Sequence, residues 1–146
     1  MMRCGAASMI SDGARIQKAR QWRKRYGGGM RQVGLLAAAG HYALDNNVKL
    51  LKADHLRAKS IAKAIAAVAP NLINPDHVET NIVGLDLSTS KITANELSSW
   101  LQEQNILSGA LGPKYLRLVT HLDLTDDDVE YINQVLPKLL QRALMS

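Results

Sequence analysis

The spacing of apolar residues changes along the chain, from a helical period in the first half to a two-residue period in the second. In the first half, apolar and small residues at helical spacing predict three helices. The first follows Asp12, which fits an N-cap, and ends near residue 26; the others span about 31–44 and 48–69. Residues 8–11 predict a short strand before them.

Strands are predicted further along, where apolar residues alternate. Residues 80–87 and 115–120 follow this pattern, so the odd-numbered positions of each strand face one way and the even-numbered positions the other. Residues 106–108 predict a short extended piece, and 109–113 a turn. Each of the two main strands therefore has two distinct faces.

Helices alternate with these strands. Thr93, with Glu96 three residues later, forms a capping box that predicts a helix over 94–104. Thr125, followed by three aspartates, predicts a last helix to about residue 144, with a kink at Pro137. The element order predicts an α+β fold, in which a small antiparallel sheet carries helices on one face. The other face must be covered or must line a site.

Composition narrows the class of protein. Of 146 residues, 47% are hydrophobic and 21% charged, which is typical of a globular chain of one domain. No apolar run reaches about 18 residues, so no membrane partner is expected. The single Cys4 excludes an internal disulfide and fits a reducing compartment, so we expect a cytoplasmic location. The four scattered histidines have no cysteine partners, so no metal site is expected.

The net charge of +5 raises the question of nucleic-acid binding. Residues 15–25 hold six of the eighteen lysines and arginines, enough for a basic helix to contact phosphates. No set of stacking aromatic residues and no zinc motif accompanies them. A solvated helix face is the favoured interpretation, and nucleic acid is not an expected partner.

Arg117 is the sharpest candidate for chemistry, because it interrupts an apolar strand. Its guanidinium group can bind a carboxylate through two parallel hydrogen bonds. The alternative, an edge-strand arginine in water, is slightly favoured by the residues alone. His121, at the end of the same strand, could act as a base, but a histidine satisfied by the backbone is the favoured interpretation.

Three consecutive glycines, 27–29, lie between the first two predicted helices. A glycine loop that leads into a helix N-terminus can present backbone N–H groups to an anion. Arg31, at the predicted helix start, is unfavourable for the helix dipole unless an anion binds there. A hinge and an anion cradle remain equally open alternatives.

Several of these segments together resemble one family. RKRYGGGMRQVGLLAAAGHYAL at 23–44 and YLRLVTHLDLT at 115–125 stand in this order, with the pairs Asp54-His55 and Thr80-Asn81 between them. They resemble the C-terminal part of low-specificity L-threonine aldolase, over about residues 8–144. Enzymes of this family have fold type I and depend on pyridoxal phosphate (PLP).

The resemblance implies a reaction, a cofactor and residues for both. The reaction is the reversible cleavage of L-threonine or L-allo-threonine to glycine and acetaldehyde, with PLP as electron sink. The arginine of the family's RLVTH motif binds the substrate carboxylate, and Arg117 matches it. The arginine of GGGMRQ reaches a cofactor site across a subunit interface; Arg31 matches it, and Lys24, Gly28 and Gly29 join this cofactor-binding set. Homo-oligomers, typically tetramers, are implied as well.

The resemblance also implies a missing part. The family chain is more than twice as long, and its large domain carries the lysine that binds PLP, which has no match here. We therefore expect residues 1–45 to be a remnant of the large domain with interface helices, and 46–146 to be the small domain. We expect the chain alone to be inactive. The alternative is a non-catalytic module for oligomerisation or binding that derives from this family.

Overall fold

The structure, a computed structural model, describes residues 11–145 and has the expected α+β class. The strand predicted at residues 8–11 falls outside the described residues, apart from Ser11, which is not in a strand. The chain divides into two compact units, Met1–Val48 and Lys49–Ser146. Each unit is described by itself.

The first unit contains two helices, α1 (Gly13–Arg25) and α2 (Gly34–Asn46). The side chain of Asp12 accepts a hydrogen bond from the Arg15 N–H, which confirms the predicted N-cap. The predicted start of the second helix at Arg31 is wrong, because Gln32 has φ 51° in the left-handed region and residues 31–33 form a turn. Neither helix contains a buried residue.

The second unit is built on a three-stranded antiparallel sheet in the order β1-β3-β2. The strands are β1 (Ile82–Asp86), β2 (Gly109–Ala110) and β3 (Tyr115–Val119). Both predicted strands and their alternation are confirmed. The piece predicted at 106–108 is wrong: the short strand lies at 109–110, where a turn was expected, because two residues carry no detectable period.

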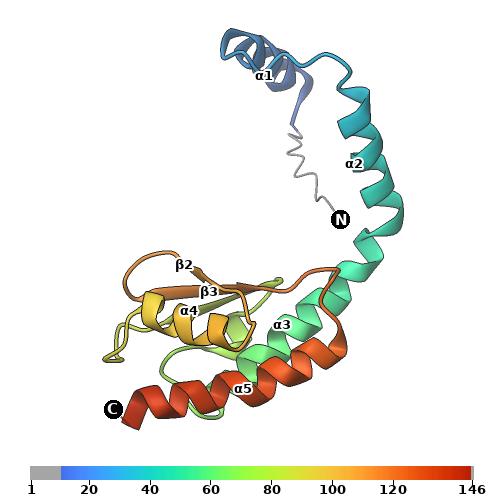
Figure 1. The fold of residues 1–146 in the computed structure, drawn as a ribbon. Coiled ribbons are helices and arrows are strands. Elements are labelled where there is room, and N and C mark those ends of the chain that lie inside the picture. Colours follow the sequence, from blue (N-terminus) through green and yellow to red (C-terminus); the bar gives the residue numbers. More distant parts are fainter. Residues whose placement is uncertain (1–10, 146) are drawn as a thin grey trace. The chain divides into compact units, whose positions relative to one another are not determined.

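Helices cover one face of this sheet (Figure 1). They are α3 (Leu51–Ala66), preceded by the 3₁₀ turn Val48–Leu50, then α4 (Ala94–Glu103) and α5 (Asp126–Met145). A further 3₁₀ turn, Pro75–His77, precedes β1. The predicted third helix is three residues shorter than expected at its end, and α5 continues through Pro137. The capping box of Thr93 and Glu96 is confirmed.

The core lies between the helices and the covered face of the sheet. Strands β1 and β3 pair with Val83 opposite Leu118 and Leu85 opposite Leu116, and all four side chains are buried. The next residues along each strand point to the other face, where no helix of this unit packs and most side chains are exposed. This open face carries Arg117.

Candidate functional site

Arg117 lies at the middle of the open face, because β3 is the central strand of the sheet. The edge-strand alternative is therefore wrong, although the side chain is exposed as that alternative required. The register partners of Arg117 are Gly84 on β1 and Gly109 on β2, so no side chain lies directly beside it on either neighbouring strand. Within residues 11–145 its guanidinium makes no hydrogen bond or ion pair. The group is thus free to bind an anion.

Beside Arg117, the side chain of Tyr115 reaches across to β1 and lies over Gly84. Beyond it is a cavity of about 360 Å³, lined in part by Gly84, Tyr115 and three polar residues, Asn74, His77 and Thr80. This arrangement could not be predicted from the residues alone, because it depends on the register between two distant strands.

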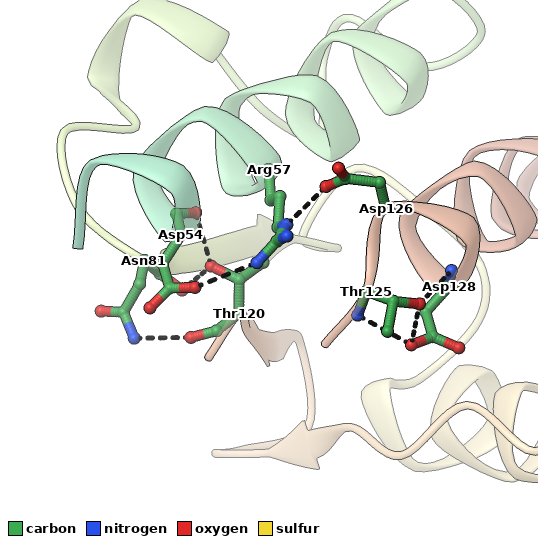
Figure 2. A network of polar contacts seen from close by, with 7 residues as sticks. All are labelled: Asp54, Arg57, Asn81, Thr120, Thr125, Asp126 and Asp128. Carbon is green, nitrogen blue, oxygen red and sulfur yellow. Dashed lines mark hydrogen bonds and ion pairs between the residues drawn. The ribbon is translucent and has the colours of Figure 1, made fainter. Parts of the chain in front are cut away.

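The end of β3 is fastened to two other elements by Thr120 (Figure 2). The buried hydroxyl of Thr120 donates to the backbone carbonyl of Asp54 on α3 at 2.7 Å. The Thr120 N–H donates to the Asn81 carbonyl at 2.9 Å, and the Asn81 amide donates to the Thr120 carbonyl at 2.8 Å. These bonds hold the strand that presents Arg117.

Arg57 links α3 to the start of α5 (Figure 2). Its Nε donates to the exposed Asp126 carboxylate at 2.8 Å, and its guanidinium lies 3.6 Å from the Asp54 carboxylate. Asp54 is 6% exposed, and its Oδ1 has no hydrogen-bond partner in the described chain. Arg57 is therefore the charge that compensates the buried Asp54.

Thr125 and Asp128 form a reciprocal cap at the start of α5. The Thr125 N–H and hydroxyl donate to the Asp128 carboxylate at 2.8 and 2.6 Å, and the Asp128 N–H donates to the Thr125 hydroxyl at 3.2 Å. These donors, first the side chain and then the backbone of Thr125, lower the pKa of Asp128. His121 lies nearby and lines a cavity of about 240 Å³.

The glycine triplet ends α1 instead of leading into α2. The N–H groups of Gly27 and Gly28 donate to the carbonyls of Lys24 and Arg23, at 3.1 and 2.7 Å. Gly27 has φ 73°, the left-handed conformation that closes many helices. The expectation of a glycine loop at a helix N-terminus is therefore wrong, since two of the three N–H groups are already bonded and α2 begins only at Gly34.

The remaining candidates of the first unit are exposed. Lys24 and Arg31 are both open to solvent, and a Cβ at Gly29 would meet nothing within 4 Å. These residues belong to the first unit and Arg117 to the second. The binding roles expected for these residues and for Arg117 therefore stay predictions.

Two other classes of site are not found in the described part of the chain. No group of three or more His, Cys, Asp or Glu residues between 11 and 145 could hold a metal ion. None of the described helices is both long and apolar enough to cross a membrane.

Comparison with known proteins identifies the family. Residues 4–88, more than half of the chain, match the beta-eliminating lyase family. Low-specificity L-threonine aldolase 1 of Arabidopsis thaliana is 38% identical over 117 residues, which are 80% of this chain and 33% of that protein. Low specificity L-threonine aldolase of Escherichia coli K12 is 38% identical over 114 residues, 78% of this chain and 32% of that protein.

A third relative carries a different name. Aldolase vrtJ of Penicillium aethiopicum is 34% identical over 134 residues, 88% of this chain and 32% of that protein. The chain thus spans about a third of the length of the curated relatives that it matches. The resemblance inferred from the GGGMRQ and LRLVTH segments is confirmed, and the chain belongs to the beta-eliminating lyase family.

Proposed function

We propose that the chain is the C-terminal part of a PLP-dependent lyase that cleaves L-threonine or L-allo-threonine to glycine and acetaldehyde. The family assignment supports a lyase, and the names of two relatives support threonine as the substrate. In this proposal the chain supplies Arg117 as the group that binds the substrate carboxylate. A cytoplasmic location remains a prediction from the single Cys4.

The observation that carries the proposal is the unpaired guanidinium of Arg117 on the open face of the sheet. It projects from a central strand, whose backbone is held on both sides, and it has glycines as its neighbours across both strands. A guanidinium on such a rigid support can bind a carboxylate through two parallel hydrogen bonds. Thr120 fixes the end of the same strand and thereby helps to position the arginine.

The cofactor would be held in part by the first unit. Two exposed cations, Lys24 and Arg31, and the open backbone at Gly29 fit a phosphate group, which such donors bind well. The Gly28 N–H donates to the Arg23 carbonyl at the end of α1, so Gly28 lies in the tight turn between Lys24 and Arg31. PLP, when bound, supplies an electron sink for bond cleavage at the amino-acid substrate. In the proposal, the lysine that attaches PLP belongs to the part of the family chain that has no match here.

The alternative function is a non-catalytic module for oligomerisation or binding. One observation is compatible with it: α1 and α2 contain no buried residue, and α2 exposes Leu35, Tyr42 and Leu44. Such helices need another surface to cover them. In the aldolase proposal that surface belongs to the rest of the enzyme or to a second subunit, so both functions predict self-association.

Binding of glycine to the isotope-labelled chain tests the proposal. Glycine and acetate are expected to shift the Nε–H resonance of Arg117 and the amide resonances of its neighbours Gly84 and Gly109, and Arg117→Gln is expected to abolish the shifts of these two amides. The matched control is Arg20→Gln, which removes the same charge from the exposed surface of α1. A response that survives Arg117→Gln, or the lack of any response at Arg117, would contradict the proposed carboxylate site.

A further inference from the structure

The cations of α1 have almost no compensating charge. Residues 15–25 carry six lysines and arginines, and α1 contains no acidic residue. Within residues 11–145, Arg15 is the one cation of this helix with a carboxylate partner, because its Nε lies 3.3 Å from the Asp12 carboxylate. The other five are open to solvent. A helix of this kind attracts anions that carry many charges.

The structure adds an aromatic stack to this basic helix. The ring centres of Trp22 and Tyr26 lie 5.6 Å apart, and the ring planes differ by 20°. The Arg25 guanidinium lies over the Trp22 ring, 5.0 Å from its centre. The residues alone did not indicate this stack, because its two rings are four positions apart and meet only once the helix forms.

The stack is open to solvent at Tyr26. This residue is 82% exposed, against 42% for Trp22. A further planar ring can therefore lie against the phenol ring without displacing a side chain. Nucleobases are planar rings that stack on aromatic side chains largely irrespective of sequence. The exposed phenol ring thus fits a nucleobase.

Two of the free cations lie on the same face as the stack. Lys18 precedes Trp22 by four positions and Arg25 follows it by three, so the helical period places both beside the indole. By the same period, Lys24 lies on the opposite side of α1. The face with the stack therefore combines planar rings with positive charge. It does not include Lys24, which the proposed function assigns to the phosphate of PLP.

We propose that this face of α1 binds single-stranded nucleic acid. A base stacks on Tyr26, and Lys18 and Arg25 contact neighbouring phosphates. A single strand is favoured over a duplex, because the bases of a duplex are already stacked on one another and cannot reach the phenol ring. Little preference for sequence is expected, since stacking does not read the edges of the bases. The inference goes beyond the proposed function and does not rest on it.

Fluorescence anisotropy of a labelled oligouridylate, titrated with the full chain, tests this inference. Binding is expected at low salt, with an affinity that falls steeply as the salt concentration rises. Tyr26→Ala is expected to weaken binding by about fivefold or more, as is Tyr26→Leu, which keeps an apolar side chain but no ring. Tyr26→Phe is the matched control, because it keeps the ring and should keep the affinity.

A second pair of variants tests the position of the charge. Lys18→Gln and Arg20→Gln remove the same charge from α1, but Arg20 lies on the side away from Trp22. Lys18→Gln is therefore expected to weaken binding more than Arg20→Gln. All these side chains are exposed, and circular dichroism checks that each variant keeps its helix content. Equal effects of the two substitutions would contradict the proposed face.

Inorganic polyphosphate, which has charge but no bases, separates stacking from simple attraction. Tyr26→Ala should leave the affinity for polyphosphate unchanged. Equal binding of oligouridylate by the wild-type chain and Tyr26→Ala would overturn the inference, as would equal binding of a duplex, stronger binding to vesicles of anionic phospholipid, or no binding at low salt. None of these measurements involves Arg117 or PLP, so their failure would leave the proposed function standing.

Discussion

Among single residues, Arg57 has the clearest energetic role. It is the cation that faces the buried carboxylate of Asp54, and it also hydrogen-bonds Asp126, whose side chain is 88% exposed. Loss of the arginine would affect the carboxylates of Asp54 and Asp126 differently. Asp126 stays hydrated, whereas Asp54 would be left buried without a compensating charge.

We predict that Arg57→Met lowers the free energy of unfolding by about 3–5 kcal/mol, the range for breaking a buried ion pair. Urea unfolding followed by circular dichroism measures this. Asp126→Asn is the control and should change stability by less than about 1 kcal/mol, as for exposed pairs. Combining Arg57→Met with Asp54→Leu should recover most of the loss. Equal effects of Arg57→Met and Asp126→Asn would show that Asp54 does not depend on the arginine.

Residue-scale features were predictable from the sequence only where they are local. Alternation placed Arg117 on the opposite face from its apolar neighbours, and the structure agrees. Nothing local indicated that Gly84 makes room for Tyr115 or that Arg57 meets Asp126, 69 positions away. These contacts depend on strand register and helix packing, which the periodicity of single segments does not contain.

At the scale of elements, α4 and α5 begin with the same kind of cap, in which a threonine and an acidic residue three positions later bond each other. Glu96 accepts from the Thr93 N–H, and Asp128 accepts from the hydroxyl and N–H of Thr125. The pKa of Glu96 is lowered, first by the backbone and then by the side chain of Thr93; the pKa of Asp128 is lowered by Thr125. Both caps therefore stabilise the helices in the ionised form of the acid.

The pH dependence follows from these lowered pKa values. The stabilisation is fully present above the ordinary pKa values of Asp and Glu, and it is lost as the pH falls through the lower values of the folded state. We predict that Thr93→Val and Thr125→Val, which remove the capping hydroxyls, lower the melting temperature at pH 7 more than at pH 3. Thermal unfolding at both pH values measures this. An equal loss at both would mean that the carboxylates contribute nothing.

The end of α1 provides a second test at this scale. Gly27 has a positive φ and Gly29 does not, and a Cβ at either would meet nothing within 4 Å. We predict that Gly27→Ala destabilises the end of α1 by about 1–2 kcal/mol, because an L-residue is strained there. Gly29→Ala is the matched control and should leave it unchanged. Amide exchange of the last turn of α1 distinguishes the two.

The limits of prediction differ between the elements. Asp12, Thr93 and Thr125 marked helix starts correctly, because capping residues act within a few positions of the chain. The start of α2 was missed, because a left-handed Gln32 is not a conformation that glutamine favours. Strand β2 was missed because its pairing with β3 defines it.

At the scale of the whole molecule, the two units differ in what they bury. All buried side chains of the described residues lie at Asp54 or beyond. The first unit instead exposes large apolar groups, among them Leu35 at 77% and Tyr26 at 82%. Apolar surface of this extent favours association.

We predict that the purified chain self-associates as its concentration rises, and that a chain limited to residues 49–146 stays monomeric at the same concentrations. Sedimentation velocity measures both. Leu35→Glu together with Leu44→Glu should weaken association, because charges would replace exposed leucines of α2. A full chain that remains monomeric at every concentration would show that α1 and α2 do not drive assembly.

We also predict that the chain alone releases no acetaldehyde from threonine in the presence of PLP. The spectrum of added PLP should likewise stay that of the free cofactor, because in the proposed function the lysine that attaches PLP lies in a part of the family chain that this sequence does not match. An assay coupled to an alcohol dehydrogenase measures the product. Product formation that disappears in Arg117→Gln would mean that a lysine of this chain replaces the missing one.

The uneven distribution of buried residues has a consequence for sequence variation. In a survey of all single substitutions scored by the abundance of the isolated chain, positions 13–46 should tolerate almost any residue, apart from proline in the helices and side chains at Gly27. Tolerance should fall sharply from Asp54 onward. The same survey scored by the activity of the complete enzyme that we propose should show constraint along α2. The difference between the two profiles would then identify the residues of α2 that pack against another surface.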